Sequence, residues 1–124
     1  MTTLDLTSAN FESTVAEHDI VLVDFWAGWC GPCRAFAPTY EAAAEANPDL
    51  VFGSVDTEAE QELAAAAQVQ SIPTLMAFRE GVLVFAQAGA LPRDSLDELI
   101  GAVRALDMDE VHRQVAARQA TQQP

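Results

Sequence analysis

The sequence predicts an α/β fold, and three observations lead to it. The chain has 124 residues, which is the size of one globular domain. Residues 20–26 (IVLVDFW) are apolar at both alternating positions, as in a strand that is covered on both faces. Helical and β-like stretches alternate along the rest of the chain. A strand of this kind belongs to the centre of an α/β sheet.

The N-terminal part supplies a short helix ahead of the central strand. Thr7 is expected to cap this helix, which carries Phe11 and Val15 one turn apart and ends near residue 18. A strand before the helix is optional. The central strand, 20–26, follows directly.

A second helix is expected over residues 30–46, where small and apolar residues recur at spacings of three and four. Pro38 should kink it, because proline has no N–H for the carbonyl four residues earlier and its ring crowds that turn. Residues 50–55 form the next β-like run. Thr57 and Glu60 then form the capping box of an alanine-rich helix that reaches about residue 68.

The C-terminal half begins with a hairpin. Residues 74–78 and 82–88 are β-like and flank a short turn at 79–81, so they are expected to pair antiparallel. Pro92 then opens a helix with one apolar stripe that ends at Leu106.

The last residues form an appendage to the domain. Asp107 with Glu110 could cap one further short helix, before a polar tail that frays from residue 119. We therefore expect a domain over 1–106 and a C-terminal helical extension over 107–124.

The charge balance excludes two classes of partner. Nineteen acidic and six basic residues leave a net charge of −13, and all six basic residues are arginines. Such an acid excess repels nucleic acid and anionic lipid. No apolar run approaches the ~20 residues of a membrane helix, and the first residues lack the basic start and apolar core of a secretory signal. We expect a cytoplasmic protein that binds neither nucleic acid nor membranes.

The two cysteines, Cys30 and Cys33, lie in the motif WCGPC at residues 29–33. A domain of this size folds without disulfides, so they are not needed as structural links. Residues three apart in a first helical turn share a face with Cβ atoms ~5–6 Å apart, close to what a disulfide permits. The pair can therefore open and close with little backbone movement.

The position of each cysteine predicts its role. Cys30 stands at the helix N-terminus, where unpaired N–H groups and the helix dipole favour a thiolate, and Cys33 lies one turn inward. Cys30 is therefore expected to attack and Cys33 to resolve. Gly31 and Pro32 suit a tight entry into that turn.

Three other interpretations of the cysteines compete with this one. A zinc site needs four ligands, and beyond the two thiols the chain offers only the distant His18 and His112. A static disulfide closing so small a loop restrains little chain entropy, and cytoplasmic reductants would open it. Two inert buried thiols would leave their position at a helix start unexplained.

Asp24 lies inside the apolar central strand, where ionising a carboxyl group is costly. We expect it to be partly protonated. Because it shortly precedes Cys30, it is a candidate acceptor, through water, for the proton of Cys33. The alternative is a carboxylate that reaches solvent at a sheet edge.

Five motifs in order and spacing resemble the thioredoxin family. They are VDFWA leading into WCGPC at 23–33, AP at 37–38, VDT at 55–57, SIPT at 71–74 and AGA at 88–90. The chain resembles a bacterial-type thioredoxin with a C-terminal helical extension. The resemblance implies the thioredoxin fold, a central mixed five-stranded sheet flanked by helices on both faces, with a cis peptide bond between Ile72 and Pro73 next to the dithiol.

The resemblance also implies an activity, which is reduction of protein disulfides by a Cys30–Cys33 electron carrier that needs no metal and no other cofactor. The implied partners are disulfide-containing protein substrates and a flavoprotein of the thioredoxin reductase type, with the chain acting as a monomer. Extended substrate peptides would lie on an apolar collar formed by Trp29, Gly31, Pro32, Ile72, Pro73, Gly89 and Ala90. One alternative is a peptide-binding, chaperone-like module, and another is a disulfide isomerase, against which Pro32 favours the reductant.

One residue departs from the family pattern. Many thioredoxins carry a lysine two residues before the aspartate of the VDT motif, and this chain has Ser54 there. Asp24 then lacks its usual cationic neighbour. We therefore expect desolvation to dominate and to raise the pKa of Asp24.

Overall fold

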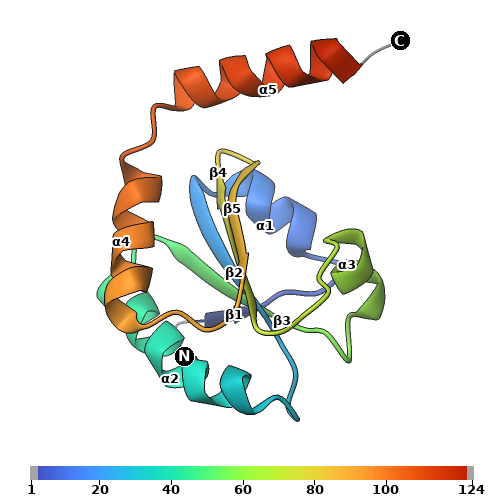
Figure 1. The fold of residues 1–124 in the computed structure, drawn as a ribbon, viewed down its shortest axis with the longest axis vertical. Coiled ribbons are helices and arrows are strands. Elements are labelled where there is room, and N and C mark those ends of the chain that lie inside the picture. Colours follow the sequence, from blue (N-terminus) through green and yellow to red (C-terminus); the bar gives the residue numbers. More distant parts are fainter. Residues whose placement is uncertain (1–2, 123–124) are drawn as a thin grey trace.

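Five strands form one mixed sheet in the order β1-β3-β2-β4-β5 (Figure 1). The computed structural model describes residues 3–122. β1, β3 and β2 are parallel to one another, whereas β4 is antiparallel to both β2 and β5. In chain order the elements are β1 (Thr3–Asp5), α1 (Phe11–Glu17), β2 (Ile20–Trp26), α2 (Gly31–Ala46), β3 (Val51–Asp56), α3 (Gln61–Ala66), β4 (Thr74–Arg79), β5 (Val82–Ala88), α4 (Arg93–Arg104) and α5 (Met108–Gln122).

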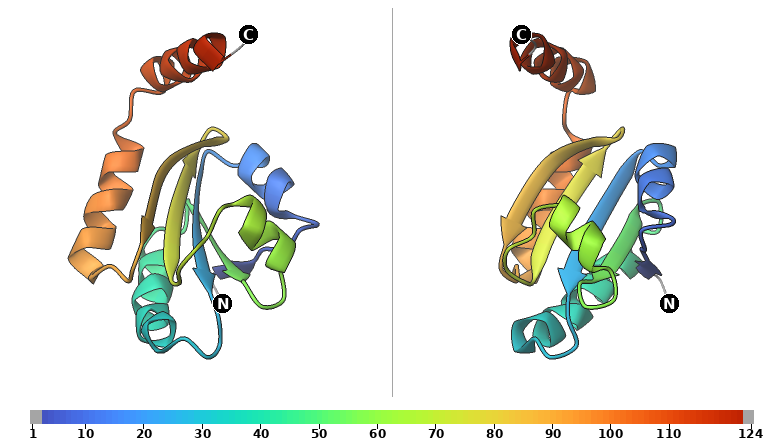
Figure 2. Two further views of the ribbon diagram at one scale, coloured as in Figure 1. Left: turned by 45° about the vertical axis from the view of Figure 1, so that its right-hand side comes forward. Right: turned by 90° about the vertical axis from the view of Figure 1, so that its right-hand side faces the viewer.

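The central strand β2 is buried on both faces, as its apolar sequence predicts. Val21 and Val23 belong to a core cluster shared with α1 and α3. Leu22 points to the opposite face and packs in a second cluster with α2 and α4. Figure 2 shows these helix pairs on the two sides of the sheet. The predicted α/β architecture with helices on both faces is therefore confirmed.

The predicted start of the first helix is wrong. α1 begins at Phe11, with Asn10 at its N-cap position. Thr7 instead opens a turn ahead of the helix, in which its hydroxyl oxygen accepts a hydrogen bond from the Ala9 N–H at 3.2 Å. Its own N–H donates to Asn10 Oδ1 at 2.7 Å. A side chain bonded within this turn does not cap the helix three residues later.

The predicted capping box is also wrong, because tertiary partners take both side chains. α3 begins at Gln61, after Glu60. The Thr57 hydroxyl donates to the Trp26 carbonyl at 3.0 Å, and Glu60 Oε1 accepts from the Ser8 N–H at 2.8 Å. The helix ends at Ala66, two residues before the expected end.

The β4–β5 hairpin is confirmed, and its turn is tight. Glu80 and Gly81 have φ values of 50° and 80°. Two successive residues with positive φ suit the right-handed twist of the flanking strands, and glycine adopts this conformation without a Cβ clash.

Arg79, the last residue of β4, binds the C-terminal end of α4. Its Nη1 donates to the carbonyl oxygens of Val103, Arg104 and Leu106 at 2.8, 3.0 and 3.2 Å. The last carbonyls of a helix have no partner within the helix and carry partial negative charge. Arg79 therefore joins the sheet to α4.

Replacing Arg79 with methionine is expected to lower the free energy of unfolding by about 1–3 kcal/mol, because the carbonyls lose a charged donor. Denaturant midpoints at unchanged m-value measure this. The matched control is Arg93→Met, which removes only an exposed pair with Asp97 one turn away and should cost ~0.5 kcal/mol or less. Equal losses in the two variants would show that the Arg79 bonds add no stability.

The C-terminal helix α5 projects beyond the β4–β5 hairpin (Figure 2). Asp107 Oδ1 accepts from the Glu110 N–H at 3.2 Å, which confirms the Asp107 half of the predicted cap, while the Glu110 carboxylate binds Arg113 and Gln114 instead. The helix continues to Gln122, and the expected fraying from residue 119 is wrong up to that point. Alanine, arginine and glutamine favour helix and extend it. Residues 123–124 of the predicted tail lie outside the described residues.

Within residues 3–122, no helix combines the length and the apolarity that a membrane crossing requires.

Candidate active site

Cys30 and Cys33 meet at the start of α2. Cys30 occupies the N-cap position and Cys33 lies in the first turn. Their sulfurs are joined in a disulfide with a Cα–Cα distance of 5.2 Å, within the usual range. The Cys33 N–H donates to Cys30 Sγ at 3.2 Å. A helix N–H directed at the Cys30 sulfur, together with the helix dipole, favours its thiolate form once the bond is reduced.

The two cysteines line different cavities. Cys30 lines an open groove of about 510 Å³ on the outer surface. Cys33 lines a second cavity of about 210 Å³ that also contains Asp24. Both cysteines are buried, at 4% and 3% exposed, so what distinguishes them is the cavity that each one lines.

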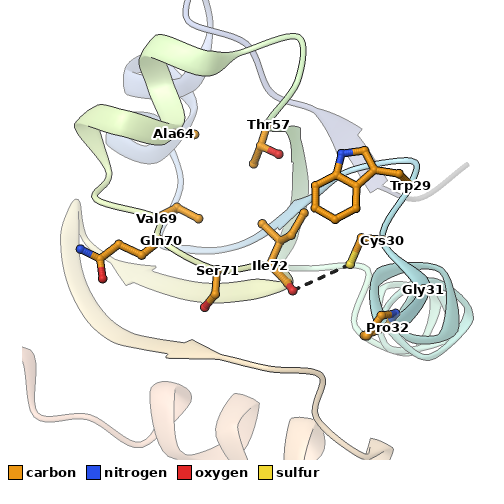
Figure 3. A pocket seen from close by; sticks show the side chains of 10 residues that line it. All are labelled: Trp29, Cys30, Gly31, Pro32, Thr57, Ala64, Val69, Gln70, Ser71 and Ile72. Atoms are coloured by element: carbon orange, nitrogen blue, oxygen red, sulfur yellow. Dashed lines mark hydrogen bonds between the residues drawn. The ribbon is translucent and has the colours of Figure 1, made fainter.

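In Figure 3, Trp29, Cys30 and Pro32 lie at one end of the groove lining and Val69 and Gln70 at the other, with Ile72 between them. Trp29 is 67% exposed, an unusual fraction for a tryptophan. Cys30 Sγ lies 3.8 Å from the Ile72 carbonyl oxygen, so the sulfur faces the loop before β4. None of the lining residues is charged, although the chain carries −13.

The groove includes four of the seven predicted collar residues. These are Trp29, Gly31, Pro32 and Ile72. It also includes residues that the sequence analysis missed, namely Thr57, Ala64, Val69, Gln70 and Ser71. All five come from α3 and its flanking loops, and their positions beside the dithiol depend on the packing of α3 on the sheet. Thr57 and Ser71 belong to the VDT and SIPT motifs, but no local pattern in the sequence marks Ala64, Val69 or Gln70.

The other three collar residues lie at the C-terminal end of β5 and the start of β4. The Ile72–Pro73 peptide bond is cis, as the resemblance implies. The Gly89 N–H donates to the Pro73 carbonyl at 2.8 Å, which joins these two segments. Gly89 and Ala90 are exposed but do not line the groove.

Asp24 is buried in the sheet, on the face that packs against α2. Only 5% of the residue is exposed, so the alternative of a solvated carboxylate does not apply. Its Oδ1 has no hydrogen-bond partner among the described residues. Burial raises the pKa of Asp24 from 3.8 to about 7, because the charged form loses its hydration.

The inner cavity brings Asp24, Cys33 and Ser54 together. Ser54 lies directly opposite Asp24 in the β2–β3 register, so the position that holds a lysine in many thioredoxins does face the carboxyl group. The cavity is roomy enough for several water molecules. Arg34 also lines it, and its Nη1 donates to the Gly28 carbonyl at 2.8 Å.

A zinc site finds no support in the described part of the chain. No group of three or more histidine, cysteine, aspartate or glutamate side chains there could hold a metal ion. His18 Nδ1 lies 2.9 Å from the Thr14 carbonyl, and His112 Nε2 lies 2.8 Å from Glu80 Oε1.

The family model, the similar sequences and the similar solved structures all point to one family. The family model described as Thioredoxin matches residues 2–102. A protein of Streptomyces coelicolor named "Putative thioredoxin 2" is 62% identical over 118 residues, or 95% of this chain and 88% of that protein. The thioredoxin of Alicyclobacillus acidocaldarius is 39% identical over 102 residues, 82% of this chain and 97% of that one. A solved mutant thioredoxin from Halobacterium salinarum NRC-1 aligns with a TM-score of 0.78 at 33% identity, covering 84% of this chain and 92% of that one.

Proposed function

Because this chain belongs to the thioredoxin family, we propose that it reduces protein disulfides in two exchange steps, Cys30 attacking and Cys33 resolving. The chain is a thiol-disulfide oxidoreductase whose substrates are proteins with disulfide bonds. The observation that carries the assignment of roles is that the two cysteines line different cavities. A substrate can approach the Cys30 sulfur from the groove, whereas Cys33 stands beside a buried carboxyl group.

In the first step the Cys30 thiolate attacks one sulfur of the substrate disulfide. A bond forms between Cys30 and that sulfur, the substrate disulfide breaks, and the other substrate sulfur leaves as a thiolate that takes a proton from water. The directed Cys33 N–H and the helix N-terminus stabilise the attacking anion.

In the second step the Cys33 thiol gives its proton to Asp24, through water in the inner cavity. The Cys33 thiolate attacks Cys30 Sγ, the Cys30–Cys33 disulfide forms, and the second substrate thiolate leaves. Two electrons have then passed from the protein to the substrate. An Asp24 pKa of about 7 suits this task, since a base of that pKa both accepts and releases a proton near neutral pH.

The groove supports a binding site for a substrate peptide. Its uncharged, largely apolar lining favours neutral or apolar residues beside the substrate disulfide. Gly89 and Ala90, which are exposed, extend this proposed surface beyond the groove, whereas Pro73 is buried and is joined to Gly89 by a backbone hydrogen bond.

Replacing Trp29 with alanine is expected to raise KM for a protein disulfide about five- to thirtyfold, because an exposed aromatic anchor contributes ~1–2 kcal/mol to binding. Reduction of a small disulfide without a peptide should keep its rate. The matched control is Leu83→Ala, since Leu83 is also exposed (48%) but lines a groove that does not contain Cys30. Steady-state kinetics with insulin measures both, and equal KM values in the two variants would contradict the binding role of Trp29.

Turnover tests the function as a whole. The protein should catalyse reduction of insulin disulfides faster than an equimolar free dithiol. A peptide-binding module would bind insulin without this acceleration, and that outcome would reject the proposal.

The oxidised protein needs a source of electrons. We propose a flavoprotein of the thioredoxin reductase type, which would place the chain in an electron-transport route, and we propose that the chain acts as a monomer in the cytoplasm without a bound cofactor. The division into a 1–106 domain and a 107–124 extension also remains a proposal. Re-reduction by such a flavoprotein with its nicotinamide donor would support the partner.

A further inference from the structure

The inner cavity has a buried end and a mouth. Asp24 and Cys33 are 5% and 3% exposed, and Tyr40 is 2% exposed. Thr3 and Glu41, which line the same cavity, are half-buried. Arg34 and Ala37, which also line it, are exposed. A proton taken up by Asp24 therefore has a path toward solvent among these four residues.

Few groups along this path can carry a proton. β2 contributes Asp24, while β1 and β3 contribute only the hydroxyl groups of Thr3 and Ser54. The charged and titratable groups that α2 contributes to the lining are Cys33, Arg34, Tyr40 and Glu41. Arginine keeps its proton, so Glu41 is the one carboxyl group besides Asp24 among these lining residues.

Tyr40 links the two carboxyl groups electrostatically but does not replace Glu41. Burial raises the pKa of Tyr40 well above its ordinary value, and the charges of Asp24 and Glu41 raise it further. Both carboxyl groups therefore act on the same buried hydroxyl. The Tyr40 hydroxyl donates its proton in a hydrogen bond to the Gly53 carbonyl oxygen at 2.7 Å. That proton is therefore not free to take part in the relay.

We propose that Glu41 relays the proton of the resolving step, receiving from Asp24, through water, the proton that Cys33 gave up and passing it to solvent. The Thr3 hydroxyl donates to Glu41 Oε2 at 3.0 Å and holds the carboxyl group at the cavity mouth. The relay returns Asp24 to its ionised form, and no bond other than O–H bonds is made or broken in it. Glu41 acts through Asp24 and is a positioning residue. This inference rests on the proposed function, in which Asp24 accepts the Cys33 proton.

Glu41→Ala tests the relay in a single turnover. The reduced protein is mixed in a stopped-flow instrument with excess of an aromatic disulfide, whose first thiolate is released by Cys30 and whose second is released when Cys33 resolves the mixed disulfide. We expect the second phase to slow about three- to tenfold near neutral pH, because Asp24, with a pKa of about 7, is partly protonated there and must first release that proton through the relay before it can accept the proton of Cys33. This is less than the ~10²-fold effect of a direct base. Formate, a small carboxylate, should restore the rate in a saturable way. Glu45→Ala is the matched control, because Glu45 is exposed on the next turn of α2 and does not line the cavity.

The outcomes separate the relay from the proposed function. A slow second phase that formate rescues in Glu41→Ala, with wild type and Glu45→Ala insensitive to formate, supports the relay. The relay is overturned if the second phase of Glu41→Ala has the wild-type rate at each pH tested, or if it is slow and formate does not restore it. Asp24→Asn should be slow and not rescued at all. If Asp24→Asn resolves as fast as wild type, the proton-acceptor role of Asp24 fails, and the relay fails with it.

Discussion

Replacing Cys33 with serine is expected to leave the protein covalently attached to its substrates. Cys30 still attacks and forms the mixed disulfide, but no second thiol is present to release it. Catalytic turnover should fall to the rate of the uncatalysed dithiol reaction. Cys30→Ser should lose turnover equally and form no covalent complex, because Cys33 lines the inner cavity rather than the groove.

Mass spectrometry and non-reducing electrophoresis of each variant after incubation with oxidised insulin measure the complexes. A reductant added before analysis should release them, which controls for linkages other than disulfides. Trapping by both variants to the same extent would show that position in the helix does not decide the roles of the two cysteines.

Replacing Asp24 with asparagine is expected to change the pH dependence of stability strongly. Unfolded, the carboxyl group titrates near 3.8, and folded, it titrates at about 7. Between these values the unfolded chain has lost the proton while the folded protein still holds it. The stability of the wild type therefore falls as pH rises through this window, and the loss is complete above the folded pKa.

The Asp24→Asn variant does not undergo this loss. Its free energy of unfolding should gain on that of the wild type by up to about 4 kcal/mol between about pH 3 and 8, at ~1.36 kcal/mol per pKa unit, and the difference should be constant above about pH 8. Any cost of burying the asparagine amide is the same at each pH and does not alter this trend. Denaturant midpoints of both proteins across the pH range measure it.

Ser54→Lys tests the cause of the raised pKa. Because Ser54 lies opposite Asp24 in the sheet, an ammonium group there should attract the carboxylate and reduce the pH-dependent difference. A difference between wild type and Asp24→Asn that does not vary with pH would mean that Asp24 is hydrated in the folded protein. The proton transfer from Cys33 would then lose its physical basis.

Short-range chemistry made much of the site predictable from the sequence. The spacing of Cys30 and Cys33 in a first helical turn determines that their sulfurs can bond, and this holds whatever surrounds the helix. The unbroken apolar run of β2 determines that Asp24 is buried. The hairpin was predictable for a related reason, since two β-like runs separated by a short turn have few ways to pair.

Tertiary structure decided the features that depend on partners far away in the chain. Thr57 and Glu60 match the sequence pattern of a capping box, yet their side chains form hydrogen bonds with the backbone of Trp26 and Ser8 instead. The packing of the fold brings these distant backbone groups close, and they compete with the local capping bonds. In the same way, only the packing of α3 and α2 on the sheet brings residues 69–71 to the groove and Glu41 to the cavity of Asp24. These contacts join segments separated by many residues, and no spacing within the sequence encodes them.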